Sequence, residues 1–340
     1  METPLVSVLM SVYNGEKYLQ EAMDSVLNQT YKNIEFLIIN DASTDSSAGI
    51  IQSYKDDRIR FFSNEENIKL TASLNRGIDL AKGKYIARMD ADDVSLPERI
   101  EKQVAFMEQH SEVGLCGTFV QNIGTNDDYV PPYKTTHDEI KFKLFFETHF
   151  PHPAAMLRKS VLDEHNLKYD TVNKVAQDYE LWNKMVNYCE VTILPEPLVK
   201  KRTHSEMTSI KATQEQLQVV KNIHRELMMK LGAVPSEKEL DVYENYFKGS
   251  APKTKEELFA LLDLFDKLIA GNAKAKIYRS DLFDRFFAEK YWMLCTTSSG
   301  FGMEVYRKYK QSVARNYFDM GSMARKKFFI KSFVRYKNDI

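Results

Sequence analysis

The sequence predicts an α/β protein with a mostly parallel sheet flanked by helices, followed by a mainly helical C-terminal region. Two observations lead to this prediction. Between residues 5 and 89, short runs rich in apolar and β-branched residues alternate with stretches whose apolar residues recur at helical spacing, as in parallel strands joined by right-handed crossovers. In residues 211–340 the patterns are mostly helical, so this part is expected to form a separate appendage.

The predicted elements of the first part alternate in a regular order. The first strand is Leu5–Val12, and Asn14 can cap the helix after it. That helix has one apolar face, formed by Leu19, Ala22, Met23, Val26 and Leu27. The order continues with a strand at 35–39, a helix at 48–54, a strand at 59–62, a helix at 70–81 and a strand at 84–89.

The composition indicates an ordinary globular protein. The 340 residues are 43% hydrophobic and 28% charged, which is enough for one large or two smaller domains. No run approaches the roughly 18 apolar residues that span a bilayer, and no basic segment leads into an apolar stretch at the N-terminus. The three cysteines are far apart and lack C-x-x-C spacing, so disulfides and zinc are not expected. We expect a cytoplasmic protein with no nucleic-acid partner.

The net charge of −1 hides a basic C-terminal segment. Residues 305–338 contain ten Lys or Arg and one acid, a net of +9, so the rest of the chain carries −10. The stretch "RKKFFIKSFVRYK" could lie on anionic lipid at the inner face of the cell membrane. A solvated or dimer-forming helix is the alternative, because Lys326 and Lys337 would fall close to the face of Phe329 and Phe333.

Acidic residues gather at the expected strand ends. The segment "RMDADD", residues 88–93, follows an apolar run, and Tyr13 and Asp41 follow two other strands. Crowded carboxylates repel one another, so a cation is expected there, and oxygen ligands favour Mg²⁺ or Mn²⁺ over zinc. Asp90 and Asp92 can point the same way on an extended segment, with a small residue between them. A solvated acidic loop is the alternative.

Several longer stretches carry a resemblance to a known family. "VSVLMSVYNGEKYLQEAMDSVLNQTY", "FLIINDASTDSS" and "LAKGKYIARMDADDVSLPERIEKQ" resemble the donor-binding half of family-two glycosyltransferases of the GT-A fold. "HPAAMLRKSVL", "AQDYELW" and "KKRTHSEMTS" resemble the acceptor half. The resemblance covers about residues 4–210. It implies a catalytic domain at 1–210, divided into a donor half at 1–110 and an acceptor half at 111–210, before the helical region at 211–340.

The resemblance implies a role for each matched donor-side residue. Tyr13 would lie near the nucleotide base, and Asp41 would accept a hydrogen bond from an N–H of that base, with UDP-sugars favoured as donors. Asp90 would approach the ribose or support the metal site, and Asp92 would bind the Mn²⁺ or Mg²⁺ that bridges the diphosphate. Asp93 could share either role.

The resemblance also implies roles for His204 and Asp178, and this chain departs from the family pattern at two positions. His204 would complete the metal or diphosphate site, and Asp178 would be the general base, with Glu180 the next residue to consider. Many relatives have Glu where this chain has Gln177. Relatives also place Arg before the Asn of "RN-x-G", whereas this chain has "LNRG", which leaves donor binding by Arg76 open.

Structural interpretations stay open for several of these residues. They are strand-end packing for Tyr13, a turn and cap for Asp41 with Asp45, a helix cap for Asp178, a surface position for His204, a turn or pocket wall for His152, and an ion pair that pins the acidic segment for Arg99.

The residues and the resemblance together predict an inverting transfer of a sugar to a hydroxyl of a glycan or lipid-linked oligosaccharide, in surface polysaccharide synthesis. A sugar-1-phosphate nucleotidyltransferase would be expected to carry a glycine-rich phosphate loop, and "YNGEKY" is not one. A protein that only binds nucleotide-sugar or glycan would be expected to have lost the acidic segment or the base, and both are intact.

Overall fold

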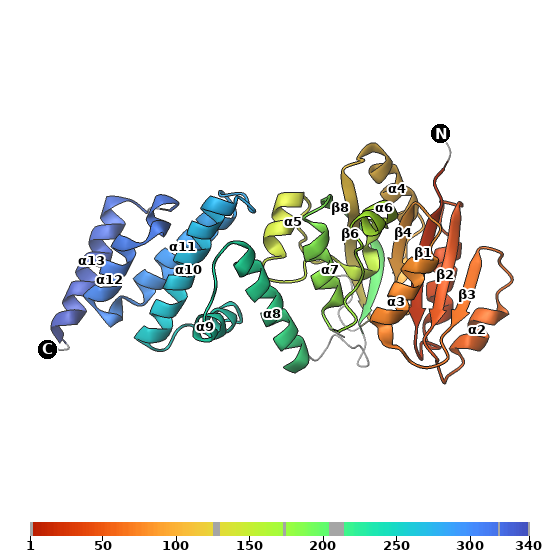
Figure 1. Cartoon of the computed structure of the whole chain (residues 1–340), viewed down its shortest axis with the longest axis horizontal. Coiled ribbons are helices and arrows are strands. Elements are labelled where there is room, and N and C mark those ends of the chain that lie inside the picture. Colours follow the sequence, from red (N-terminus) through yellow and green to blue (C-terminus); the bar gives the residue numbers. More distant parts are fainter. Residues whose placement is uncertain (1–2, 125–129, 173–174, 204–213, 319, 339–340) are drawn as a thin grey trace. The chain divides into compact units, whose positions relative to one another are not determined.

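The computed structural model describes residues 3–124, 130–172, 175–203, 214–318 and 320–338. The chain divides into two compact units, Met1–Leu217 and Gln218–Ile340. The first unit combines a sheet with flanking helices, and the second is helical (Figure 1). The predicted fold class is therefore confirmed.

The described residues of the first unit form an eight-stranded mixed sheet in the order β3-β2-β1-β4-β7-β6-β8-β5. Strands β3, β2, β1 and β4 are parallel neighbours, as predicted. Strand β7 then runs antiparallel to both β4 and β6, while β8 is parallel to β6 and antiparallel to β5. The strands are β1 Val6–Val12, β2 Ile34–Asn40, β3 Ile59–Ser63, β4 Tyr85–Met89, β5 Val94–Ser95, β6 Val113–Gly124, β7 Met156–Arg158 and β8 Glu190–Thr203.

The helices of this unit include all those predicted between residues 5 and 89, with bounds shifted by at most a few residues. They are α1 Leu19–Leu27, α2 Ser47–Ser53, α3 Lys69–Leu80, α4 Arg99–Gln109, α5 His137–Lys143, α6 Lys159–Glu164 and α7 Gln177–Met185. The predicted cap at Asn14 is wrong, because the residue before α1 is Tyr18. Asn14 instead adopts a left-handed conformation with φ 51°, which asparagine tolerates well, and its Oδ1 accepts a hydrogen bond from the backbone N of Thr44.

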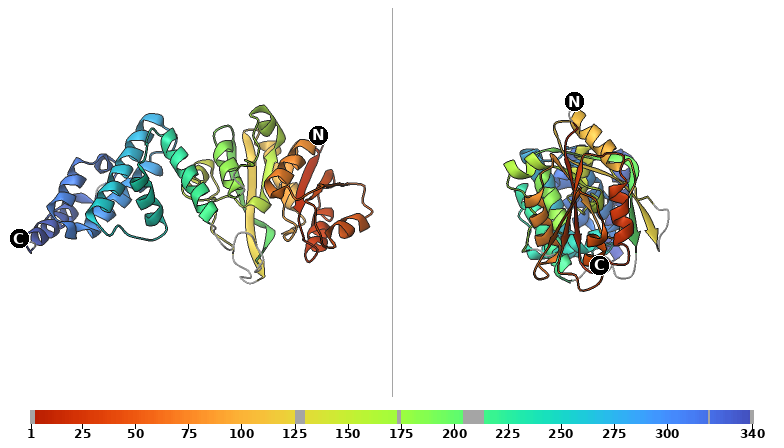
Figure 2. Two further views of the ribbon diagram at one scale, coloured as in Figure 1. Left: turned by 60° about the horizontal axis from the view of Figure 1, so that its bottom comes forward. Right: turned by 90° about the vertical axis from the view of Figure 1, so that its right-hand side faces the viewer.

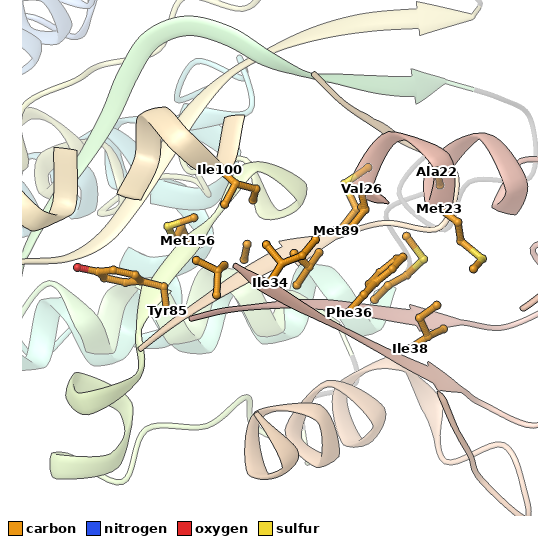
Figure 3. Packing of buried hydrophobic residues seen from close by; sticks show 14 of the residues in the cluster. Ala22, Met23, Val26, Ile34, Phe36, Ile38, Tyr85, Met89, Ile100 and Met156 are labelled. Carbon is orange, nitrogen blue, oxygen red and sulfur yellow. The ribbon is translucent and has the colours of Figure 1, made fainter. Parts of the chain in front are cut away.

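Both faces of the parallel strands are buried, which explains why these strands are apolar almost throughout. Side chains on one face of β1, such as Val8 and Met10, belong to a cluster with residues of α1, α2 and α4. Figure 3 shows part of this cluster, with Met23 and Val26 of α1 above the strands. Leu9 faces the opposite side, where α3 approaches so closely that Gly77 leaves no room for a Cβ atom.

The second unit contains most of α8 and the helices α9 to α13 (Figure 1, Figure 2). Helix α10 packs by one face into the core of this unit, where Leu258, Leu261 and Phe265 are fully buried. Ser236 with Glu239 and Thr254 with Glu257 form capping boxes at the starts of α9 and α10. The helices are α8 Gln214–Lys230, α9 Glu237–Phe247, α10 Lys255–Ala275, α11 Phe283–Thr297, α12 Met303–Gln311 and α13 Gly321–Asn338. Among the described helices, none combines the length and apolar composition needed to cross a membrane.

The close approach of α3 to β1 leads to a stability prediction. A Cβ atom at Gly77 would lie 2.1 Å from Cδ1 of the buried Leu9, so Gly77→Ala should lower the free energy of unfolding by about 1–3 kcal/mol. Gly49 of α2 has nothing within 4 Å of the same position, and Gly49→Ala should be neutral or stabilise by up to about 1 kcal/mol. Urea unfolding of both variants measures the difference. Equal stability of the two variants would contradict the tight α3–β1 contact.

Candidate active site

Three of the predicted site residues directly follow neighbouring strands. Tyr13 follows β1, Asp41 follows β2 and Asp90 follows β4. In the register of these parallel strands Val12 is paired with Asn40, and Met10 with Met89, so the three residues share the carboxyl edge of the sheet. Ligands of open α/β sheets bind at this edge. Tyr13 is 53% exposed there, so it does not pack into the core.

The loops after β1 and β2 are held together by side-chain hydrogen bonds. The backbone N of Glu16 donates to Oδ2 of Asp45 over 3.0 Å, and the backbone N of Gly15 donates to Oγ of Ser47 over 2.9 Å. Asp45 also accepts from the backbone N of Ser47 over 3.0 Å, which is the turn role that was open for it. A Cβ atom at Gly15 would lie 3.6 Å from that of Ala91, so the same loop borders the acidic segment.

Asp41 is buried and rigidly positioned. Its Oδ1 accepts hydrogen bonds from Nδ2 of Asn64 over 2.7 Å and from the backbone N of Ile68 over 2.9 Å. Arg76 donates to Oδ1 of Asn64 and to the backbone carbonyl of Ser63, so it reaches Asp41 through Asn64 rather than directly. The structure thus connects Arg76 to the Asp41 end of the site.

The three aspartates of the acidic segment converge. One carboxylate oxygen from each of Asp90, Asp92 and Asp93 lies within 4.8 Å of the other two. Asp90 forms an ion pair with Arg88, which is almost fully buried. Asp93 is also buried, and its Oδ2 atom has no hydrogen-bond partner among the described residues. Burial, together with the charges of Asp90 and Asp92, raises the pKa of Asp93 well above its usual range.

This arrangement fits a hard divalent cation. A buried carboxylate oxygen without a partner, close to two further carboxylates, is costly unless a proton or a cation is present. A set of carboxylate oxygens suits Mg²⁺ or Mn²⁺ and contains none of the nitrogen or sulfur ligands that zinc prefers. His204, the other predicted metal ligand, lies outside the described residues.

Arg202, near the end of β8, holds the acidic segment in place and was not identified from the sequence. Its backbone N donates to Oδ1 of Asp93 over 2.8 Å, and its Nε donates to the carbonyl of Asp92 over 3.0 Å. Its Nη2 pairs with Glu21 of α1 over 2.6 Å, and its guanidinium lies 4.4 Å from the ring centre of Tyr18. The only sequence signal for Arg202 was its position inside the quoted "KKRTHSEMTS" stretch.

Arg99 supports the acidic segment through hydrogen bonds to backbone carbonyls, and not through the predicted ion pair. The side chain is fully buried and donates to the backbone carbonyls of Arg88 and Ala155, over 2.8 and 3.3 Å, and to Gln103. Among the described residues no carboxylate lies within ion-pair distance of it. Burial, and then the charge of Arg88, lower the pKa of Arg99 to about 9. The backbone carbonyls of Arg88 in β4 and of Ala155 just before β7 are therefore its anchor.

Asp178 lies in the first turn of α7. The residue before the helix is Ala176, so Asp178 is not the N-cap itself, although its Oδ1 accepts a hydrogen bond from the backbone N of Tyr179 over 2.8 Å. Burial raises the pKa of Asp178, and the positive charges of Arg88 and Lys201 partly oppose this. Because Arg88 also pairs with Asp90, it links the acidic segment electrostatically to Asp178.

His152 lies against two aromatic side chains, those of Tyr169 and Trp182. Nε2 of His152 is 2.8 Å from the hydroxyl of Tyr169, and its ring is 5.9 Å from that of Trp182 in α7. Burial and the charges of Arg88 and Lys201 lower the pKa of His152 well below its usual range, so it is neutral at pH 7. His152 begins a short 3₁₀ turn, in agreement with the structural role considered for it.

The sequence analysis also missed Asn75, which joins the two halves of the unit. Asn75 belongs to α3, and its side chain both donates to the backbone carbonyl of Tyr169 over 2.8 Å and accepts from its backbone N over 3.0 Å. This pair of bonds fixes the Tyr169 segment of the predicted acceptor half against a helix of the donor half. The residue lies in "LNRG" beside Arg76, and no local pattern in the sequence indicates its partner.

Comparisons with known proteins agree with this arrangement. The family model described as glycosyl transferase family 2 matches residues 7–165. An uncharacterised glycosyltransferase of Haemophilus influenzae is 35% identical over 235 residues, which cover 66% of this chain and 73% of the relative. The O-antigen biosynthesis glycosyltransferase WbnJ of Escherichia coli is 34% identical over 211 residues, covering 60% of this chain and 82% of WbnJ.

Solved structures show the same fold at low sequence identity. Residues 1–349 of TarS from S. aureus, in complex with UDP-GlcNAc, superpose with a TM-score of 0.59 at 17% identity, over 92% of this chain and 89% of that chain. The structure of the same TarS fragment with UDP gives a TM-score of 0.57 at 15% identity, over 98% of this chain and 92% of that one.

The contacts of Arg202 lead to a prediction about the acidic segment. Arg202→Gln removes the bond to the Asp92 carbonyl and should cost about 1 kcal/mol of stability, and it should also reduce the rise in melting temperature that Mn²⁺ produces. Glu21→Gln is the matched control, because it breaks only the ion pair with an exposed carboxylate and should leave the Mn²⁺ effect intact. Thermal unfolding with and without Mn²⁺ measures both. Equal Mn²⁺ effects in the two variants would exclude a positioning role for Arg202.

Proposed function

The chain belongs to glycosyl transferase family 2, and from this premise we propose that it is an inverting enzyme that moves a sugar from a nucleotide-sugar donor to a hydroxyl group of a glycan or lipid-linked acceptor. Its first unit has the GT-A fold. The observation that supports the proposal most is the convergence of Asp90, Asp92 and Asp93 at the sheet edge, with Asp178 joined to them electrostatically through Arg88.

The nucleotide is proposed to bind over the ends of β1 and β2. Oδ1 of Asp41 accepts hydrogen bonds from Asn64 and Ile68, while its Oδ2 accepts none from the described residues. This second oxygen would accept an N–H of the base, and the exposed ring of Tyr13 would lie against the base, with UDP-sugars favoured. Arg76 would contribute to donor binding indirectly, because it holds Asn64 in place.

The diphosphate is proposed to bind at the acidic segment. Asp92, with His204, would hold a Mn²⁺ or Mg²⁺ ion. This ion would neutralise the negative charge that develops on the leaving diphosphate. Asp90 would face the ribose or support the metal site while its ion pair with Arg88 holds it in place. The backbone N of Arg202 and the buried position of Asp93 would keep the segment in one conformation, so that little reorganisation is needed when the donor binds.

Asp178 is proposed to be the general base. It would take the proton of the acceptor hydroxyl while that oxygen attacks the anomeric carbon and the bond to the diphosphate breaks, which inverts the configuration in a single displacement. The raised pKa of Asp178 makes the carboxylate a stronger base than a solvated aspartate. Arg88 and Lys201 oppose that rise, which favours the ionised form that can accept a proton.

The acceptor class is proposed from the relatives. WbnJ is described as an O-antigen biosynthesis glycosyltransferase, and this chain covers 82% of its length. Synthesis of a surface polysaccharide on a glycan or lipid-linked oligosaccharide, in the cytoplasm or at the inner face of the cell membrane, is the matching role. Such acceptors carry the sugar hydroxyl that the proposed mechanism requires.

A donor panel tests the proposal as a whole. The chain is incubated with UDP-, GDP- and dTDP-sugars and Mn²⁺, and the released products are identified. We expect release of the nucleoside diphosphate, fastest with a UDP-sugar, and none from Asp92→Ala or after chelation of the metal. Release of pyrophosphate would instead indicate a nucleotidyltransferase. Donor binding without any release, in the presence of candidate acceptors, would indicate a binding protein.

The role of Asp178 is tested by Asp178→Asn. The amide keeps the size and the acceptor for Tyr179 but cannot take a proton, so transfer should fall by about 10² or more while donor affinity is retained. Because the pKa of Asp178 is raised in the folded state, its ionised form destabilises the fold above that pKa. The variant should therefore be at least as stable as the parent at pH 7. Steady-state kinetics and thermal unfolding give these quantities.

The pH dependence of the activity distinguishes a catalytic role of Asp178 from a purely structural one. Wild-type activity should fall as the pH drops through the raised pKa of Asp178, because protonation removes the base, and the residual activity of Asp178→Asn should lack this limb. Glu180→Gln, two residues further along α7, is the control and should keep both turnover and the limb. If Glu180→Gln lost the activity and Asp178→Asn kept it, the assignment of the base would be wrong.

A further inference from the structure

The basic C-terminal segment divides into two parts with different surroundings. Its first part belongs to the core of the second unit, since Val305 and Tyr309 of α12 and Ala314 after it are buried. Lys308 pairs with Asp263 of α10, which neutralises one of its charges inside the unit. The apolar side chains of this part are therefore not available to a partner. The surface considered for lipid contact is therefore that of α13, and not the whole of residues 305–338.

One face of α13 is packed and the opposite face is not. Phe328 and Ser332 are buried, and the ring of Phe328 lies 5.3 Å from that of Tyr306 in α12 and 5.6 Å from that of Trp292 in α11. These contacts orient the helix about its axis. Residues about half a turn from Phe328 and Ser332 must therefore face away from the helical unit.

The outward face of α13 is apolar to an unusual extent. Met323, Ile330 and Val334 are 71%, 56% and 51% exposed and fall on one stripe at about 3.6 residues per turn. Phe329 and Phe333 lie on the neighbouring stripe with stacked rings 6.1 Å apart, and each is at least 40% exposed. Ile330, Val334, Phe329 and Phe333 thus form an exposed strip of large aliphatic and aromatic side chains, as at interaction surfaces, and Lys326 and Lys327 separate it from Met323.

Basic side chains accompany this strip. Lys326, Lys327 and Lys331 are exposed, and within the part of the chain that the structure describes none of them forms an ion pair. The sequence of α13 contains no acidic residue to offset them. The surface that faces away from the helical unit is thus both apolar and positively charged, and it complements a partner that is apolar inside and negatively charged at its surface.

We propose that α13 docks on an anionic lipid bilayer, lying in the plane of the headgroups with Ile330, Phe333 and Val334 toward the acyl chains. Lys326 lies on the apolar face itself, one turn before Ile330, where its long stem allows the ammonium group to reach the headgroups, as lysines do at membrane interfaces. Lys327 and Lys331 flank the strip and add attraction to anionic lipid. This inference depends only on α13 and stands whether or not the proposed donor chemistry is correct.

The test uses the full chain and vesicles. Flotation is compared for vesicles of phosphatidylcholine alone and of phosphatidylcholine with phosphatidylglycerol, at low and high salt. We expect binding to the anionic vesicles only, weakened by salt. The triple variant Lys326→Glu, Lys327→Glu, Lys331→Glu should lower the partition coefficient at least about tenfold. The double variant Ile330→Ser, Val334→Ser should weaken binding at both salt concentrations, because it removes apolar area.

Matched controls come from the same unit. The exposed lysines Lys230, Lys238 and Lys274 are changed to Glu, and the exposed Met229 and Val234 to Ser, and these variants should bind as the wild type does. Circular dichroism and melting temperature check that every variant is folded. Binding reduced equally in the controls would overturn the assignment to α13. So would self-association that depends on Ile330 and Val334 with no vesicle binding, because the strip would then be a contact between copies of the chain.

Discussion

Three carboxylates that share one edge of the sheet repel one another, and the first unit is organised around the groups that hold them there. Arg88 pairs with Asp90 from within the sheet, and the backbone N of Arg202 reaches Asp93 from the end of β8. Arg99 donates a hydrogen bond to the backbone carbonyl of Arg88. Without such support, the buried Asp93 beside two further carboxylates would favour protonation or unfolding of the segment, so its position depends on cations and donors from three separate elements.

The same contacts connect the two halves of the unit. Arg88 lies on β4 and pairs with Asp90, and its positive charge acts to lower the pKa values of both Asp178 and His152. Asn75 binds the backbone of Tyr169 across the unit with a donor and an acceptor. Asn75 thus ties the Tyr169 segment to α3 by two hydrogen bonds, while Arg88 is linked to Asp90 by an ion pair and to Asp178 by its charge.

Local patterns allowed much of this to be predicted. The alternation of apolar runs and helical spacing located the strands and helices up to β4, and the order of β1, β2 and β4 brought Tyr13, Asp41 and Asp90 to one edge. Asn14 was predicted wrongly because a cap and a left-handed loop position favour the same residue type. Arg99 was expected to pair with a carboxylate of the acidic segment, but it binds the backbone carbonyls of Arg88 and Ala155 instead.

The sequence by itself determined the parallel strands, the placing of the acidic segment at a strand end, and the helical nature of residues 214–338, because each depends on residues close together in the chain. Only the tertiary structure decided that Arg202 would meet Asp93, that Asn75 would bind Tyr169, and which face of α13 would be buried. These contacts join residues far apart in sequence or on different helices. Their formation depends on strand register and on the packing of each helix, and no local pattern of residues encodes either.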